Sequence, residues 1–208
     1  MLFDIIDTKD SRRKQAERMI HDRFQEVYGA NIRQFMPKLL HLSSREHHDI
    51  AMLGFRPASE ERLFLERYLH DPIEIAISNH VVQPVQRDEI VEVGNLADFR
   101  SGGARAAIVA ACAFLYGAGY SWVVFTGVPM LYNAFYRLGL EPVIIAEAHQ
   151  ASLNCKEQDE WGNYYETSPK VMFGNIHEGQ EALEYNKNIL HPLWEKAVEQ
   201  GRIKKQTV

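Results

Sequence analysis

One segment, residues 89–142, constrains the fold of this chain more than any other. It begins with an apolar, β-branched run at 90–96, which is typical of a buried strand. A glycine-containing turn follows at 100–105, and then a long apolar run rich in alanine, whose small side chains let a helix lie close against a sheet. A second apolar run at 122–126 and an amphipathic stretch at 129–138 complete the segment. The order strand, glycine turn, helix, strand, helix predicts an α/β fold.

The turn at residues 100–105 is a candidate anion site. A glycine turn that leads into a helix offers unpaired backbone N–H groups at the positive end of the helix dipole. Arginines beside it could add charge-assisted hydrogen bonds to the same anion. The alternative is an ordinary tight turn, because neither the dinucleotide G-x-G-x-x-G motif nor the P-loop motif is present. The candidate residues are Arg100, Gly102, Gly103, Ala104 and Arg105.

The order of elements, the R-S-G-G turn and the final R-L-G-L resemble the core of the N-acyltransferase (GNAT) superfamily. More closely, the chain resembles the thermostable hemolysin family, and a more distant likeness is to acyl-homoserine-lactone synthases, which share the GNAT fold. The segments that carry the resemblance cover most of residues 35–179. They are LFLERYL (63–69), DPIE (71–74), VEVGNLA (91–97), WVVFTG (122–127), FYRLGL (135–140) and WGNYY (161–165).

The resemblance implies an α/β fold with a GNAT-like mixed, twisted β-sheet flanked by helices. We expect one domain over residues 1–208, with an excursion from the fold at about 150–169. The remaining elements are predicted as helices at 11–28, 61–69 and 178–200, and as strands within 31–42 and at 50–56, 143–148 and 171–176. A further helix is expected to start with Asp71 as N-cap, Pro72 as its first residue and Glu74 as the partner of the cap.

The resemblance also implies a thioester donor. In the superfamily the turn grips the pyrophosphate of acyl-coenzyme A, and the neighbouring strand offers backbone groups to the pantetheine, here those of Leu96 and Ala97. We therefore expect an acyltransferase that moves an acyl group longer than acetyl from acyl-coenzyme A or acyl-carrier protein to a small-molecule amine. An acidic carrier protein would need a local basic patch, which Arg100 and Arg105 could provide.

The chain departs from the superfamily pattern in the last helix, before that helix, and in the glycine turn. Phe135 stands where a general-acid tyrosine is common, and Tyr136 lies on a different face of the helix. Val128 stands where an asparagine is expected, and Ala104 and Arg105 follow the two glycines of the turn. These departures argue against standard acetyl transfer to an amine, and they leave open a protein of the same fold that binds an acyl ligand without turnover.

Three polar residues are candidates for catalysis. Glu92 lies in an otherwise apolar strand, where a carboxylate is costly unless it is paired or useful. In the superfamily a glutamate on this strand often acts as general base through water; the alternative is a structural ion pair with Arg56 or Arg87. Asn95, near the place of an arginine in lactone synthases, could orient a substrate carbonyl. Thr126 could hydrogen-bond the acyl carbonyl or the pantetheine, or cap the following helix.

The aromatic residues of the excursion are candidates for substrate contact. Trp161, Tyr164 and Tyr165 could close over a long apolar acyl chain. The alternative is that they anchor the excursion onto the body of the protein.

Composition excludes several classes of function. A net charge of −5 gives no electrostatic case for nucleic acid or an anionic membrane. The N-terminal apolar run is too short for a signal peptide and no segment has the length of a bilayer span, so we expect a cytoplasmic protein without stable membrane insertion. Two cysteines do not make a disulfide framework. His41, His47 and His48 lack the spacing and partners of a metal site, so no metal is expected.

The name of the hemolysin family suggests an alternative class, a membrane-active lytic protein. Such a protein would need an exposed amphipathic segment, for which Ala104–Leu115 and the C-terminal helix are the candidates. The first is apolar apart from Arg105 and the second is highly charged, so neither has the pattern of an interfacial helix.

Overall fold

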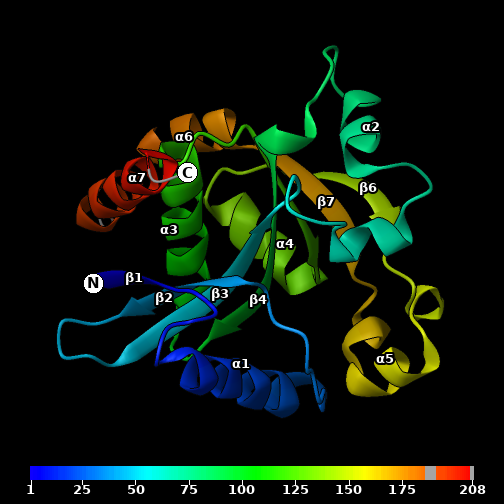
Figure 1. Cartoon of the computed structure of the whole chain (residues 1–208), viewed down its shortest axis with the longest axis horizontal. Helices are drawn as coiled ribbons and strands as arrows, with labels where there is room; N and C mark the ends of the chain where they lie inside the picture. Colours follow the sequence, from blue (N-terminus) through cyan, green and yellow to red (C-terminus); the bar gives the residue numbers. More distant parts are fainter. Residues whose placement is uncertain (186–190, 207–208) are drawn as a thin grey trace.

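The structure is a computed structural model that describes residues 1–185 and 191–206. Within this part of the chain a seven-stranded sheet has the order β1-β2-β3-β4-β5-β7-β6, with helices on both faces (Figure 1). The strands are β1 (Leu2–Ile6), β2 (Lys38–Ser43), β3 (Asp49–Pro57), β4 (Ile90–Asp98), β5 (Trp122–Gly127), β6 (Val143–Glu147) and β7 (Lys170–Asn175). The α-helices are α1 (Arg13–Tyr28), α2 (Ile73–Ser78), α3 (Gly103–Gly117), α4 (Pro129–Arg137), α5 (Cys155–Glu160), α6 (Ile176–Tyr185) and α7 (His191–Gln206). Short 3₁₀ helices are η1 (Phe64–Tyr68), η2 (Arg87–Glu89), η3 (Gln150–Ser152) and η4 (Tyr164–Thr167).

β4 and β5, the parallel pair at the centre of the sheet, separate from each other after a short ladder. Residues 90–93 of β4 pair with residues 122–125 of β5, whereas the other neighbouring strands of the sheet are antiparallel. Beyond this short ladder β4 continues along β3 as far as Asp98, and β5 continues along β7 as far as Gly127. The two strands therefore diverge, and their facing edges are left without a strand between them.

A bulge in β4 lies at the point of divergence. The register against β3 shifts between Met52 and Gly54, and Asn95 has a φ of 51°. Bulges of this kind bend a strand and increase its twist. A Cβ atom at Gly54 would lie 2.5 Å from the Cβ atom of Met36, so glycine lets the loop before β2 lie directly on the sheet here.

One face of the sheet is covered by α3, α6 and α7, which lie together in Figure 1. Ala107, Ala110 and Phe114 of α3 are buried against the sheet and these helices. The backbones of α3 and α7 are in close contact, because a Cβ atom at Gly117 would lie 2.2 Å from the carbonyl oxygen of Val198. The stretch 104–115 thus belongs to the core.

The other face carries α1 and the segment from η1 to α2. Ile20 and Phe24 of α1 pack with Leu39 and Met52 of the sheet. Further along the same face, apolar residues of η1 and α2 pack on β4, β5 and β7; they are Leu63, Leu65, Ile73, Ile77, Ile90, Trp122, Val124 and Phe173. This face therefore carries two separate clusters, one under α1 and one under η1 and α2.

The structure confirms the predicted fold class and corrects several elements. Residues 143–148 and 171–176 were predicted as a pair of strands, and they form the antiparallel pair β6 and β7. Strand β7 also pairs with β5, so it lies between β5 and β6. Strand β1, with the buried residues Phe3 and Ile6, was missed. The helix predicted at 178–200 falls into α6 and α7, and 186–190 lie outside the described residues.

The predicted capping of α2 by Asp71 is wrong. The helix begins at Ile73 and its N-cap is Pro72. Glu74 binds Arg87 instead, with 2.7 Å between its Oε2 atom and the Nη1 atom of Arg87. A charge-assisted hydrogen bond to a guanidinium is stronger than one to a backbone N–H, so the carboxylate turns to the arginine.

Candidate active site

A cavity of about 580 Å³ lies where β4 and β5 diverge, and both faces of the sheet contribute to its wall. The helices α3, α4 and α6 supply mainly aliphatic residues; these are Ile108, Ala111, Cys112, Leu115, Leu131, Ala134, Gly179 and Ala182. The opposite face supplies aromatic residues; these are Phe24, Tyr28, Phe64, Tyr68, Trp161, Tyr164 and Tyr165. The cavity thus has an aliphatic part and an aromatic part, joined through the gap in the sheet.

Glu92 lines this cavity from the centre of β4 and is only 3% exposed. Its Oε2 and Oε1 atoms accept hydrogen bonds of 3.0 Å from the backbone N–H groups of Phe64 and Leu65, at the start of η1. The Nε atom of Arg56 lies 3.5 Å from Oε2. Burial raises the pKa of the Glu92 carboxyl, while the Arg56 charge and the two backbone donors act in the opposite direction. Of the two arginines considered as partners, Arg56 is the one the structure brings to Glu92.

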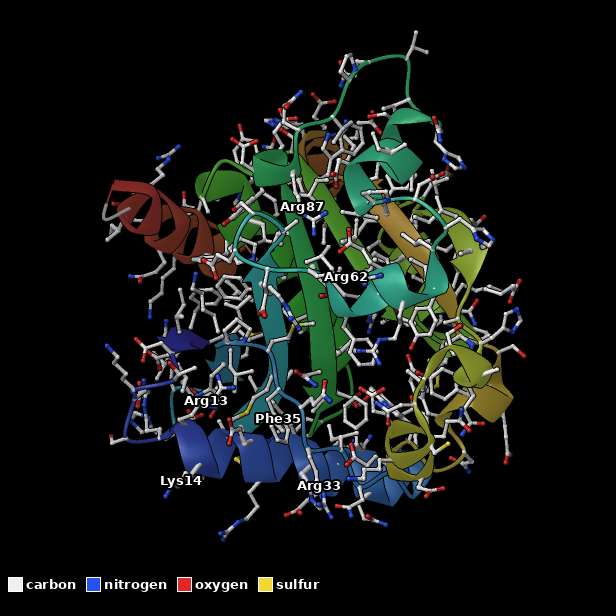
Figure 2. The ribbon with its side chains drawn as sticks, turned by 45° about the vertical axis from the view of Figure 1, so that its right-hand side comes forward. Arg13, Lys14, Arg33, Phe35, Arg62 and Arg87 are labelled. Carbon is white, nitrogen blue, oxygen red and sulfur yellow. The ribbon has the colours of Figure 1, made fainter. Side chains whose placement is uncertain are left out.

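Asn95 lines the cavity too, and it holds the neighbouring loop. Its Oδ1 atom accepts a hydrogen bond of 2.8 Å from the backbone N–H of Met36, and its Nδ2 atom lies 3.5 Å from the carbonyl oxygen of Gln34. The loop between α1 and β2, in which Figure 2 labels Phe35 next to α1, therefore forms a fixed wall. To hold the substrate carbonyl as well, Asn95 would have to donate an N–H of its Nδ2 amide group to that oxygen.

Thr126 lies in β5 just past the residues that pair with β4. It lines the cavity, and by strand alternation it lies on the same face as Trp122 and Val124, the face that also carries Glu92. The structure thus brings Glu92, Asn95 and Thr126 to one cavity. Helix α4 begins at Pro129 after Val128, and its N-cap makes no side-chain hydrogen bond, so Thr126 does not occupy the capping position that was its alternative role.

The predicted anion turn connects β4 with α3. Gly102 has a φ of 80°, in the left-handed region that favours glycine. The backbone N–H of Gly103 donates to Arg100 and that of Ala106 donates to Gly102, at 2.9 and 3.1 Å. The N–H groups of Ala104 and Arg105, which lie between Gly103 and Ala106 in the sequence, belong to the first turn of α3. The N–H groups of a first helical turn have no carbonyl within the helix to donate to.

Arg100 and Arg105 are exposed at this turn. In the described part of the chain neither guanidinium makes an ion pair, so both charges are available to a ligand. Ala104, the first residue after the glycines, lines the cavity that Glu92 also lines. The turn therefore borders the candidate site at Ala104.

The backbone groups of Leu96 and Ala97 differ in direction. The N–H of Phe99, just after β4, donates to the carbonyl of Ile50 in β3. Two residues earlier in β4, Ala97 lies opposite Met52 of β3. Since successive residues of a strand point their backbone groups to opposite edges, Ala97 faces β3 and Leu96 faces the open gap. Leu96 is thus the better placed of the two to bind an extended ligand in the gap.

Trp161, Tyr164 and Tyr165 line the aromatic part of the cavity and are anchored at the same time. The ring of Trp161 lies 6.1 Å from that of Phe24 and 5.8 Å from that of Phe64. The hydroxyl groups of Tyr68 and Tyr165 are hydrogen-bonded, and burial raises the pKa of both phenols. Both roles considered for this segment, cavity wall and anchor, are compatible with its position.

The excursion is tied to the body by polar contacts as well. Glu157 binds the Nη1 atom of Arg67 at 2.8 Å and accepts a hydrogen bond from Gln34 at 3.2 Å. The backbone N–H of Asn163 donates to the carbonyl oxygen of Tyr28 at 2.9 Å. These contacts place the aromatic residues over the C-terminal end of α1.

Sequence reasoning missed part of the aromatic wall and one charged residue. Phe24, Tyr28, Phe64 and Tyr68 line the cavity and were given no role in the site. Arg56 was considered only as a partner of Glu92, yet it lines the cavity itself. The helical spacing of Phe24 and Tyr28 and of Phe64 and Tyr68 is the signal that could have indicated an aromatic face.

Two further observations concern the described residues alone. Among residues 1–185 and 191–206, no three histidine, cysteine or acidic side chains gather in a way that could hold a metal ion. The helices in this part of the chain are all too short or too polar to cross a bilayer.

The comparisons with known proteins agree with this architecture. A model of the family described as thermostable hemolysin matches residues 6–180. A search of curated proteins found no match. Among solved structures, the AHL synthase LasI has a TM-score of 0.59 at 10% identity, with 88% of this chain and 93% of that chain covered.

Two further solved structures are similar to the same extent. FeeM, an N-acyl amino acid synthase from uncultured soil microbes, has a TM-score of 0.58 at 13% identity, covering 88% of this chain and 99% of that one. BjaI, a CoA-dependent acyl-homoserine lactone synthase with SAM and isopentyl-CoA, has a TM-score of 0.58 at 14% identity, covering 97% and 99%. At these identities the likeness shows a shared fold, that of acyl-transferring synthases. The match over residues 6–180 shows the family: the chain belongs to the thermostable hemolysins.

Proposed function

We propose that the protein is an acyltransferase that moves an acyl group from acyl-coenzyme A or acyl-carrier protein to an amine. One observation carries this proposal: Glu92 and the first turn of α3, at Ala104, line the same cavity between the diverging strands. A candidate proton acceptor and the start of a candidate phosphate site would thus border one space. The shared fold with acyl-transferring synthases supports the assignment at the level of the fold.

The donor would bind along the gap. Its phosphates would accept hydrogen bonds from the N–H groups of Ala104 and Arg105 and charge from the Arg100 and Arg105 guanidinium groups. The pantetheine would follow β4, with the backbone of Leu96 as its partner. The acyl chain would enter the aliphatic part of the cavity beside α3 and α6.

The reaction would be a direct transfer. The ammonium group of the acceptor would lose a proton to the Glu92 carboxylate, through water or directly. The amine nitrogen would then attack the thioester carbonyl carbon, forming the C–N bond as the C–S bond breaks. The nitrogen then loses its second proton, and the leaving thiolate takes up one proton to give the free thiol. Asn95 or Thr126 would steady the carbonyl, and most of the acceleration would come from holding the two substrates together.

A second candidate is a protein of this fold that binds an acyl ligand without turnover. The observation that favours it is Phe135, which lines the cavity with its ring 4.9 Å from that of Phe125 and has no hydroxyl to protonate a leaving thiolate. Tyr136, the next residue, is 72% exposed and points away from the cavity. If this candidate is right, donor binding will be observed without product.

Direct membrane lysis would require a different arrangement of the chain. The segment 104–115 is buried between the sheet and α7, so it could reach a bilayer only by leaving the core. Leakage from liposomes exposed to the pure protein would support lysis, and donor binding without leakage would support the transferase.

Calorimetric titration and thermal shift with acetyl-, octanoyl- and palmitoyl-coenzyme A test the proposal first. We expect binding that depends on chain length and that weakens roughly 10-fold or more in Arg105→Ala, because a charge-assisted contact is lost. Arg45→Ala removes an equally exposed arginine from the turn between β2 and β3 and should change nothing. If neither these compounds nor the corresponding acyl-carrier-protein thioesters bind the folded protein, the transferase assignment is wrong.

A further inference from the structure

The guanidinium of Arg56 lies at the wall of the candidate site, beside Glu92. Its buried Nε atom lies 3.5 Å from Oε2 of Glu92, an ion pair in which no hydrogen bond is formed. Because Nε is buried against Glu92, contact with a ligand falls to the two Nη atoms of the guanidinium. Arg56 is 16% exposed, and it lines the same cavity as Glu92.

The other contacts of Arg56 leave it able to bind a ligand. Its Nη1 atom lies 3.0 Å from Glu61, whose side chain is 56% exposed, and an ion pair with so exposed a partner is weak. Its Nη2 atom lies 3.4 Å from the sulfur of Met36, a weak acceptor. A carboxylate entering the cavity could replace these contacts with the bidentate geometry that a guanidinium prefers.

Arg56 and Glu92 together present one positive and one negative charge to the cavity, side by side. A free amino acid carries the complementary pair, an ammonium and a carboxylate on one carbon atom. With its ammonium on Glu92 and its carboxylate on Arg56, such a molecule would place its nitrogen beside the base. A simple amine would bind Glu92 and bring no carboxylate for Arg56, so it would make one charge-assisted contact fewer.

The side chain of such a substrate would meet aromatic rings. Phe64 begins η1 directly beside the Glu92 carboxylate, and Trp161 packs on it with its ring 5.8 Å away. Tyr68 and Tyr165 extend the same wall. Large flat side chains gain most from such a surface, by burial and by ring-to-ring contact.

We therefore propose that the acceptor is a carboxylated primary amine, an amino acid with an aromatic or large apolar side chain, and that Arg56 selects it by binding its carboxylate. This inference rests on the proposed acyl transfer and specifies its acceptor.

Matched pairs of acceptors test this inference. Each amino acid is compared with the amine that lacks its carboxylate: L-tyrosine with tyramine, L-phenylalanine with phenethylamine, and L-leucine with isoamylamine. Amide formation is measured by mass spectrometry with the acyl thioester that binds most tightly, and binding of each acceptor to the donor-loaded protein is measured by calorimetry. We expect the amino acid of at least one pair to have a kcat/KM roughly 10- to 100-fold above that of its amine, the range expected for one charge-assisted contact.

Variants of Arg56 separate selection from structure. Arg56→Gln should remove the preference for the carboxylated acceptor by raising its KM, while binding of the donor stays unchanged. Arg56→Lys should restore part of the preference, which loss of folding could not do. Arg62→Gln is the matched control, because Arg62 is an exposed arginine on the segment before η1, labelled in Figure 2.

Failure of the inference can be told from failure of the proposed function. If the thioesters do not bind, the transferase itself is wrong. If they bind and the amines react as well as the amino acids, or Arg56→Gln leaves the preference intact, the role of Arg56 is wrong. The inference is also overturned if the protein binds the donor but neither binds nor acylates any of the three amino acids.

Discussion

The Oδ1 atom of Asn95 accepts a hydrogen bond of 2.8 Å from the backbone N–H of Met36 and so fastens the loop at 29–37 to the bulge of β4. From the other side, Arg13 of α1 donates to the carbonyl oxygen of Met36 at 2.7 Å. The wall of the cavity formed by this loop is therefore held from both the sheet and the first helix. Its position does not depend on a ligand.

We expect Asn95→Ala to destabilise the protein. The substitution leaves the Met36 N–H unpaired, which costs about 1–3 kcal/mol, and it places alanine at a φ of 51°, which adds roughly 1–2 kcal/mol. Asn95→Asp keeps an accepting oxygen and should lose less. Urea denaturation measures the difference; an alanine variant within about 0.5 kcal/mol of the natural protein would show that the contact is unimportant.

Glu92→Gln should stop turnover without preventing donor binding. Loss of a general base typically lowers the rate by about 10²–10⁴-fold. In the natural protein the pKa of Glu92 is raised by burial above the ordinary value of 4.5, and only the ionised form can accept a proton. Activity should therefore fall as the pH drops through this raised pKa, so that kcat/KM declines at a higher pH than for an ordinary glutamate. A glutamine variant with the natural rate would exclude Glu92 as the base.

Glu66 is expected to make stability depend on acid pH. It accepts hydrogen bonds from Arg87 at 2.7 and 2.9 Å and from the backbone N–H groups of Leu63 and Ile73. Burial opposes its ionisation, but these contacts outweigh burial and lower its pKa. A carboxyl with a lowered folded pKa stabilises the fold above its unfolded pKa, and this stabilisation is lost as the pH falls through the folded value.

Glu66→Gln should therefore reduce stability at neutral pH and flatten its decline in acid. Urea denaturation at about pH 7 and about pH 3 compares the two proteins. Glu199→Gln, at an exposed position of α7, is the control and should leave the pH dependence as it is. An equally steep decline in Glu66→Gln would show that other carboxyls are responsible.

The two cysteines should react at different rates. Burial raises the pKa of the Cys112 thiol to about 12, so almost none of it is thiolate near neutral pH, whereas Cys155 is exposed in α5. Alkylation followed by mass spectrometry should show one fast and one slow site. Because Cys112 lines the aliphatic part of the cavity, a bound long-chain thioester should slow it further, and acetyl-coenzyme A should do so less. Equal protection by both donors would place the acyl chain elsewhere.

The sequence by itself predicted the elements whose signal is local. The apolar strand at 90–96, the glycine turn and the alanine-rich helix appear in the structure as β4, the turn before α3, and α3, because burial, backbone freedom at glycine and helix propensity are properties of short stretches. Strand β1 was missed because its five residues are few and are followed at once by charges. The candidate anion-binding residues and Glu92 could be predicted as well, because a glycine turn and a carboxylate in an apolar strand are visible in short stretches of sequence.

Only the tertiary structure decided what these elements form together. β4 diverges from β5 because its last residues pair only with β3, while the last residues of β5 pair only with β7. This choice of partners is not visible in any short stretch of the sequence. The partners of Glu92 lie 28 and 27 residues before it in the chain, at Phe64 and Leu65. Asn95, which lines the cavity, also holds a loop 59 residues away. Contacts between distant residues arise from packing of the whole chain, and they determine which polar groups are left free to bind a ligand.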